Sequence, residues 1–516
     1  MKNTLLGLAT IAIASASGTL IAKDSSSPSS HHSDKIVGKA PFVTLTAQNL
    51  DQANTPIHPF INSALPNPPK NVYSGNLFQL RHDYPSSAAE VKNPAWKAVT
   101  NNGRITQQNA MAYVEALKSY VSDDMRKLIY NYDQWNASQE PWWESIWLGT
   151  EREPIYGFYV GSGFPAETLT DQKLDLTTYV LTLYDKTAAA TLGNIWGTSL
   201  KSAYNPNITN PGAQYAEGSV IVKFAFVTPC GADWAPMEGT ASVPIYAPLN
   251  ESNGSGNNPD TSKCPNNGSA GSTADPSLTN IYMMQFDIIV KDSQAAPETG
   301  WVFSTLVYDK DAPGKDAWEK MVPLGATWGN NPDVINLSSD ALTPPAKVNT
   351  QLSQNWINMN SPEYARSTLG WDGRLSGPND GAVVTPAWAG SHYYPKGLSS
   401  AGCLACHSSA QYNPKSVSTN QPNMVSFLLP STTQPPQVIN APLSSTNQAL
   451  VLNEPGSKDW MKWFQSRAGD VPMDSGQVSL DYDMVTAFKA IPMWQAALQA
   501  MEREDAAKAS LTRKAQ

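Results

Sequence analysis

Cysteine is scarce in this sequence. Only four Cys occur among 516 residues, which excludes a disulfide-dense scaffold and makes each Cys a candidate ligand or attachment point. Charged residues are also sparse at 15%, and no basic stretch offsets the net charge of −9. These features exclude a general nucleic-acid-binding protein, because a basic surface supplies most of the affinity for phosphates. An acidic surface can still attract a basic protein partner.

Long apolar runs are missing beyond the N-terminus, so the sequence predicts a protein that is not integral to a membrane. The N-terminal stretch MKNTLLGLATIAIASASGTLIA has Lys2 before an uncharged run, and Ala16 and Ala22 offer plausible cleavage points. We therefore predict a signal peptide over residues 1–22, a flexible Ser-rich leader over 23–40, and export, most simply to a periplasm.

Aromatic residues, proline and glycine are abundant, with 16 Trp, 20 Tyr, 40 Pro and 33 Gly. This composition favours a loop-rich protein containing β-structure over a helical bundle. Segments rich in β-branched and aromatic residues, flanked by turn-forming residues, indicate β-strands. The expected strands lie at 177–185, 219–227, 242–249, 281–292 and 300–310.

One strong helix interrupts these strands, within residues 106–135. Apolar side chains recur there at helical spacing and should form one buried face. They are Ala110, Val114, Leu117, Val121, Met125 and Leu128.

The sequence thus predicts an α+β fold, mainly β, in two parts. A β-rich domain is expected over residues 41–390, with a Gly-, Pro- and Ser-rich crossing at 375–400. A loop-rich, helical C-terminal region should follow over 391–510. Its helices are expected at 457–467 and 479–505, the second broken or kinked before Pro492 because proline interrupts helical hydrogen bonding.

The most reactive side chains lie in CLACH at 403–407, where Cys403, Cys406 and His407 fall within five residues. In the CxxCH pattern, two thiols add to the two vinyl groups of haem and the next imidazole binds the iron. Export supports this interpretation, because haem is attached to such motifs outside the cytoplasm.

Three alternatives to haem remain for CLACH. A zinc site needs a fourth ligand, and no second Cys or His pair at ligand spacing is visible. A thioredoxin-like dithiol needs a strand-to-helix junction, which the preceding KGLSSAG does not suggest. A structural disulfide between the two Cys leaves His407 without a role.

Through CLACH the chain resembles the c-type cytochromes. It is also similar to long bacterial proteins of the cytochrome c family that carry one haem motif near the C-terminus, a group of unsettled activity. Segments such as GWVFSTLVYDKDAPG (300–314) and DGRLSGPND (372–380) carry this second resemblance. The resemblance implies one covalently bound haem c in residues 391–510, electron transfer, and an unidentified redox partner protein.

A sixth iron ligand is expected from the same resemblance, because small c-type cytochromes commonly take a Met from a loop before the final helix. Met473 fits that position, so His407 and Met473 are the predicted iron ligands. Met424 and His392 are the alternatives. An open position is a further alternative and would suit a haem enzyme of the peroxidase or oxidase type.

The residues just before CLACH read as a loop instead of the helix usual in small cytochromes. The haem could therefore be embedded against the β-rich body.

The remaining two cysteines, Cys230 and Cys264, could form a disulfide in an oxidising compartment. Cys264 lies in a long polar stretch that cannot form a core, and a bridge to Cys230 would restrain it by roughly 3–4 kcal/mol in the chain-entropy model. Two unpaired thiols are the alternative.

Overall fold

The computed structural model describes residues 58–164, 168–174, 176–228, 232–248, 275–335, 346–381, 398–415 and 450–514, with residues 342 and 430 and the short strands 387–389 and 392–394. The predicted signal peptide and leader lie outside these ranges, as do Cys230, Cys264 and Met424.

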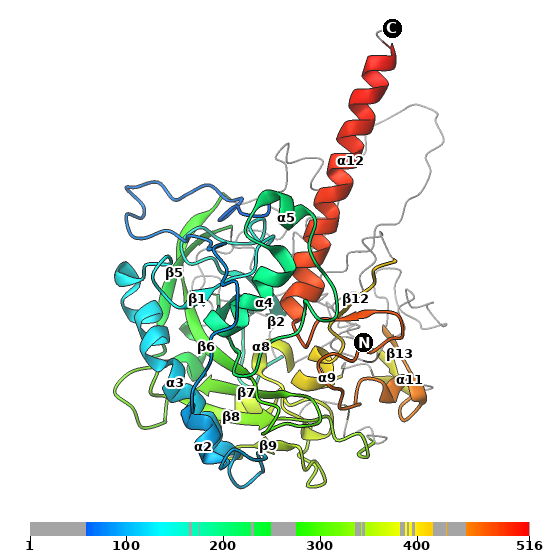
Figure 1. Ribbon diagram of the computed structural model, residues 1–516. Helices are drawn as coiled ribbons and strands as arrows, with labels where there is room; N and C mark the ends of the chain where they lie inside the picture. Colours follow the sequence, from blue (N-terminus) through cyan, green and yellow to red (C-terminus); the bar gives the residue numbers. More distant parts are fainter. Residues whose placement is uncertain are drawn as a thin grey trace, which may run out of the picture.

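A nine-stranded antiparallel sheet forms the centre of the described structure (Figure 1). Its main path runs β1-β3-β4-β6-β7-β8-β9, while β2 also pairs with β3 and β5 also pairs with β6. The strands are β1 (Trp142–Trp143), β2 (Tyr159–Phe164), β3 (Leu176–Asp185), β4 (Val220–Val227), β5 (Ser242–Ala247), β6 (Ser277–Lys291), β7 (Trp301–Tyr308), β8 (Met321–Thr327) and β9 (Asn355–Ile357).

All five strands expected from the sequence are present, as β3 to β7, and the expected combination of a large sheet with a few helices is confirmed. These strands are β-branched and aromatic on both faces because both faces of the sheet are covered. In β4, for example, seven of the eight residues are buried.

The first face of the sheet is apolar and lies against helices α2 (Ala95–Val99) and α3 (Ala110–Tyr130). The six residues predicted to form the buried face of the long helix are all buried in α3. Aromatic rings fill this core, with Phe224 and Phe286 centroids 4.4 Å apart and Phe286 and Trp318 centroids 5.0 Å apart. Helical periodicity and alternating strand residues therefore meet in one core, as the patterns predict.

The second face of the sheet is covered by α4 (Lys186–Trp196) and by segments from the C-terminal region. Leu404, Leu480 and Ile491 belong to the same buried cluster as Ala225 of β4 and Phe303 of β7. The described C-terminal segments therefore share a core with the sheet. The domain boundary near residue 390 stays a prediction.

The C-terminal helices differ in length from the expectation. Helix α11 covers only Lys458–Met461, and the chain continues with i→i+3 hydrogen bonds from Trp463 to Trp460 and from Phe464 to Met461. Before Pro492, a π-helical turn (Thr486–Ala490) leads into α12 (Ile491–Lys514). Because proline has no N–H, the regular α-helical hydrogen bonding is interrupted here, while the helical backbone continues through Ile491 into α12. Figure 1 shows α12 projecting from the body.

Short elements complete the described structure and connect its parts. Strands β12 and β14 pair Gln411 with Ser479, which joins the chain just after CLACH to the chain just before the π-helical turn. No helix among the described residues has the length and apolar character needed to cross a membrane. The remaining elements are α5 (Leu200–Tyr204), α7 (Glu363–Arg366), α8 (Pro378–Gly381), β10 (Ala387–Ala389), β11 (His392–Tyr394), α9 (Cys403–His407), β12 (Gln411–Tyr412), β13 (Leu450–Leu452) and β14 (Val478–Ser479).

Asp185 fastens α4 to the sheet. Asp185 is the N-cap of α4, and its Oδ1 accepts a hydrogen bond from Ala188 N at 2.8 Å. The same oxygen accepts a second hydrogen bond from Val220 N at 3.1 Å. We expect Asp185→Ala to lower the free energy of unfolding by about 2 kcal/mol, because a buried N-cap and a second amide both lose their acceptor. Urea denaturation measures this loss. Ser199→Ala, which removes the exposed N-cap of α5, is the control; an equal loss in both variants would contradict the prediction.

Candidate functional site

CLACH forms the short helix α9, held against the segment that precedes α8. Cys403 N donates to Leu375 O at 2.8 Å. Gly402, at the start of α9, has φ of +109°, and a Cβ there would lie 3.1 Å from Arg374 Cβ and 3.3 Å from Leu375 O. Glycine is therefore favoured at this position by backbone conformation and by space.

His407 has a fixed orientation. Its Nδ1 lies 2.8 Å from Tyr482 O, and its ring centroid lies 4.6 Å from that of Phe303 in β7. A carbonyl only accepts hydrogen bonds, so Nδ1 carries the proton and Nε2 keeps a lone pair for a metal. Burial lowers the pKa of His407 to about 4, which keeps the imidazole neutral at physiological pH.

The turn that presents the Tyr482 carbonyl is strained and strongly anchored. Asp481 and Tyr482 have φ of +46° and +69°, in the left-handed region that non-glycine residues rarely adopt. Asp481 is fully buried, and its carboxylate lies 2.7 Å from Lys291 Nζ and 2.7 Å from Trp301 Nε1. It also accepts from Tyr215 N at 2.8 Å. These contacts from the sheet side hold the turn that orients His407.

Cys403 and Cys406 are free, half-buried thiols. Burial raises the pKa of Cys403 to about 12, and Asp287 and Asp380 raise it as well. The pKa of Cys406 is also raised by burial. Thiols that act in disulfide exchange have lowered pKa values, so this environment does not favour a thioredoxin-like role.

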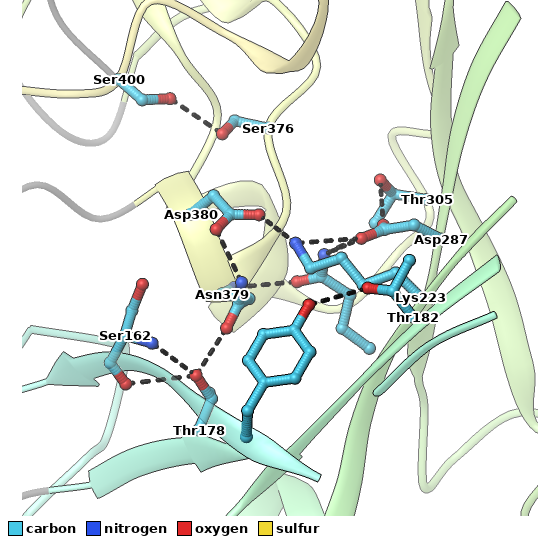
Figure 2. A network of polar contacts seen from close by, with 12 residues as sticks. Ser162, Thr178, Thr182, Lys223, Asp287, Thr305, Ser376, Asn379, Asp380 and Ser400 are labelled. Atoms are coloured by element: carbon cyan, nitrogen blue, oxygen red, sulfur yellow. Dashed lines mark hydrogen bonds and ion pairs between the residues drawn. The ribbon is translucent and has the colours of Figure 1, made fainter. Parts of the chain in front are cut away.

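A polar row crosses the second face of the sheet beneath α8 (Figure 2). Thr182, Lys223, Asp287 and Thr305 are successive cross-strand neighbours on β3, β4, β6 and β7. Lys223 Nζ lies 3.5 Å from Asp287 Oδ2, and Thr305 Oγ1 donates to Asp287 Oδ1 at 2.7 Å. In the sequence, Lys223 and Asp287 stand out only as charged residues inside expected strands. That they pair with each other depends on the register of β4 and β6.

Helix α8 completes this network from above the sheet. Asp380 forms an ion pair with Lys223, and Asn379 N donates to Gln285 Oε1 at 2.8 Å (Figure 2). Burial opposes the charged form of Lys223, but Asp380 and Asp287 raise its pKa above the usual value. Burial also opposes ionisation of Asp380, but Lys223 lowers its pKa below the usual value. The Lys223–Asp380 pair therefore stays charged, whereas burial raises the pKa of Asp287. The pair holds α8 against the sheet.

An aromatic cluster lies on the other side of Cys406. Trp371 and Trp460 stack with centroids 4.1 Å apart and planes at 4°, and Trp463 belongs to the same buried cluster. The indole Nε1 atoms of all three are buried without a hydrogen-bond partner in the described structure. Buried donors normally have partners. Trp96, Trp147 and Trp196, which lie outside this cluster, also have buried Nε1 atoms without a partner in the described structure, so these donors do not by themselves indicate a ligand. The aromatic surface next to Cys406 fits the apolar ring of the predicted cofactor.

Of the three candidate sixth ligands, only Met473 has a side chain in the described part of the structure. Met473 is half-buried and packs against the aromatic cluster that Cys406 also contacts. His392 lies in β11, but its side chain is outside the described part of the structure, as is all of Met424. The structure therefore brings Met473 into the neighbourhood of the motif, and its role as a ligand stays a prediction.

Within the described ranges, no group of three or more His, Cys, Asp and Glu side chains is arranged to hold a metal ion. No protein-family model, curated protein or solved structure matches the chain. The function is therefore argued from the site alone.

Proposed function

We propose that this protein is an exported monohaem c-type cytochrome that transfers electrons one at a time to or from a protein partner. One observation carries the proposal. His407 belongs to a CxxCH motif, and its Nδ1 lies 2.8 Å from the Tyr482 carbonyl, which leaves Nε2 for iron. Imidazoles that bind metals commonly donate their other N–H to a carbonyl or carboxylate, so the contact with the Tyr482 carbonyl suits His407 to this role.

Each residue of the motif has a defined role in this proposal. Cys403 and Cys406 would hold the haem through two thioether bonds, one to each vinyl group. His407 would provide Nε2 to the iron, and the Tyr482 carbonyl keeps the ring in place. When bound, haem supplies a reversible one-electron change at iron. Phe303, which lies beside His407, and Leu404, which belongs to the motif, add apolar surface that restricts access of water.

The test is the absorbance spectrum of the full-length protein, produced in a host that attaches c-type haem and purified from the exported fraction. We expect one haem per chain and a pyridine haemochrome spectrum typical of two thioether bonds. A protein without haem, or with haem that organic solvent extracts, would show that the proposal is wrong.

Met473→Ala tests the sixth ligand. We expect loss of the methionine–iron charge-transfer band and a reduction potential lower by on the order of 0.1 V, a part of the roughly 0.8 V range that axial ligands span. Met461→Ala is the matched control, because Met461 packs against the same aromatic cluster. An unchanged band in Met473→Ala would eliminate Met473 as the ligand. Rapid CO binding by the reduced wild-type protein would instead favour a haem enzyme.

A further inference from the structure

A second candidate site lies on the opposite face of the sheet from CLACH. A cavity of about 480 Å³ is enclosed by the chain around residues 76–79, the end of α3 with the turn that follows it, β3, and the residue after β1. Its deepest lining residues are buried, whereas those at its open side are exposed. The buried lining residues are Phe78, Leu128, Glu144, Tyr156, Leu181 and Leu183.

Glu144 is the unusual group in this cavity. Its side chain is only 7% exposed, and Oε2 has no hydrogen-bond partner in the described structure. Trp143 of β1 pairs with Tyr184 of β3. Glu144 follows Trp143 and therefore lies opposite Leu183, on the same face of the sheet as Leu181 and Leu183. A buried carboxylate oxygen without a donor is costly. Glu144 lines the cavity, so a cation bound there would stabilise its carboxylate.

Aromatic rings line the same cavity. Tyr132 and Tyr156 stack with centroids 3.8 Å apart, and Phe78 and the half-buried Trp135 also line the cavity. The faces of such rings carry negative partial charge and attract cations. They also bury the apolar part of a ligand.

The charges of the cavity favour one sign of ligand. Two carboxylic acids, Glu144 and the exposed Asp133, are among its lining residues, and no Lys or Arg is. Arg152 lies over the ring of Phe78, 5.2 Å from its centroid, and does not line the cavity. Its Nη2 donates to the Ser145 carbonyl, and no ion pair joins it to Glu144 in the described structure.

We propose that this cavity binds a small organic ammonium ion with an aromatic or short aliphatic group, its charge paired with the Glu144 carboxylate and its apolar part held against the aromatic rings. This site is separate from CLACH and independent of the proposed haem function. The volume of the cavity suits a ligand of this size, and its negative character disfavours carboxylates and phosphates.

The pH dependence of binding follows from the surroundings of Glu144. Burial raises the pKa of Glu144 to about 7, although the nearby Arg152 and Arg81 act to lower it. The other titratable groups facing it are Tyr84 and Tyr132, whose pKa values are raised so that both stay neutral. A bound cation stabilises the carboxylate, so binding releases a proton below pH about 7. Affinity should therefore increase as the pH rises toward that value and level off above it.

Isothermal titration calorimetry on the purified full-length protein tests the proposal, with benzylammonium as the probe and benzyl alcohol and benzoate as its neutral and anionic counterparts. We expect benzylammonium to bind at least about tenfold more tightly than benzyl alcohol, and benzoate not to bind. Equal binding of the alcohol, or no binding of the ammonium ion, would overturn the proposal.

Three variants connect binding to the cavity. Glu144→Gln should weaken benzylammonium binding at least about tenfold and remove its pH dependence. Trp135→Ala, a change at a half-buried position, should weaken it several-fold without loss of the fold. Glu115→Gln removes one negative charge from the exposed side of α3 and is the matched control for Glu144→Gln. Unchanged affinity in both Glu144→Gln and Trp135→Ala would place the bound ion elsewhere and overturn the proposal.

Discussion

The protein with both Cys403→Ser and Cys406→Ser, produced like the wild type in a host that attaches c-type haem, is expected to contain no covalently bound haem. Serine hydroxyls do not form thioether bonds with vinyl groups, and both thiols lie on the one short helix α9, so no other described thiol can replace them. Haem-dependent peroxidase staining after denaturing electrophoresis measures the loss. Cys403→Ser alone or Cys406→Ser alone should retain at most one thioether bond. The pyridine haemochrome band of each should then differ from that of a haem with two thioether bonds.

His407→Ala should likewise reduce haem content to a small fraction of the wild-type level, because the iron loses its fixed imidazole ligand. His82→Ala, at a histidine of the segment before α2, is the control and should retain full haem content. Undiminished haem staining in the double cysteine variant would refute covalent attachment at CLACH. A normal spectrum for His407→Ala would refute its assignment as an iron ligand.

The second large effect is expected at Asp481. Asp481→Ala leaves the Lys291 ammonium group buried without its partner and removes the acceptor of Trp301 Nε1. Removing one partner of a buried ion pair costs about 3–5 kcal/mol, so we expect a loss of this size in the free energy of unfolding. Urea denaturation followed by circular dichroism measures it.

The matched control for Asp481→Ala is Glu298→Ala, which breaks an ion pair with Arg104, a side chain that is 64% exposed. Solvent screens such pairs, so this variant should lose less than about 1 kcal/mol. Because Asp481 holds the turn that presents Tyr482 O to His407, Asp481→Ala should also change the visible spectrum of the haem-loaded protein. A loss no larger than that of the control would mean that Lys291 is rehydrated in the variant and that the turn does not depend on the ion pair.

Local patterns in the sequence were sufficient for much of the fold. Strands β3 to β7 fall where segments rich in β-branched and aromatic residues predict them, and helix α3 falls where helical spacing of apolar residues predicts it, because such patterns depend only on near neighbours in the chain. The interruption of α-helical hydrogen bonding before Pro492 is equally local. Helix α11 is shorter than expected, since Trp460 and Phe464 pack against Trp371, a contact between distant segments that helical spacing does not describe.

The candidate site also has one part that the sequence determines and one part that only the tertiary structure determines. CLACH and its spacing determine by themselves which two thiols and which imidazole lie together, because they share one helical turn. The partner of His407 Nδ1 is a carbonyl 75 residues away, and any residue type offers a carbonyl, so no sequence signal identifies it. Tertiary structure alone selects Tyr482 for this role.

Contacts between distant segments also determine the environment of three charged residues, Lys223, Asp287 and Glu144. The sequence determines that these charged residues lie in or beside apolar strands. Whether each one is paired, solvated or left without a partner depends on the register of the sheet and on the segments that cover each face. Register places Lys223 beside Asp287, and the segments that cover Glu144 leave its Oε2 without a hydrogen-bond partner in the described structure, because burial and hydrogen bonding are properties of the assembled layers and not of the strand itself.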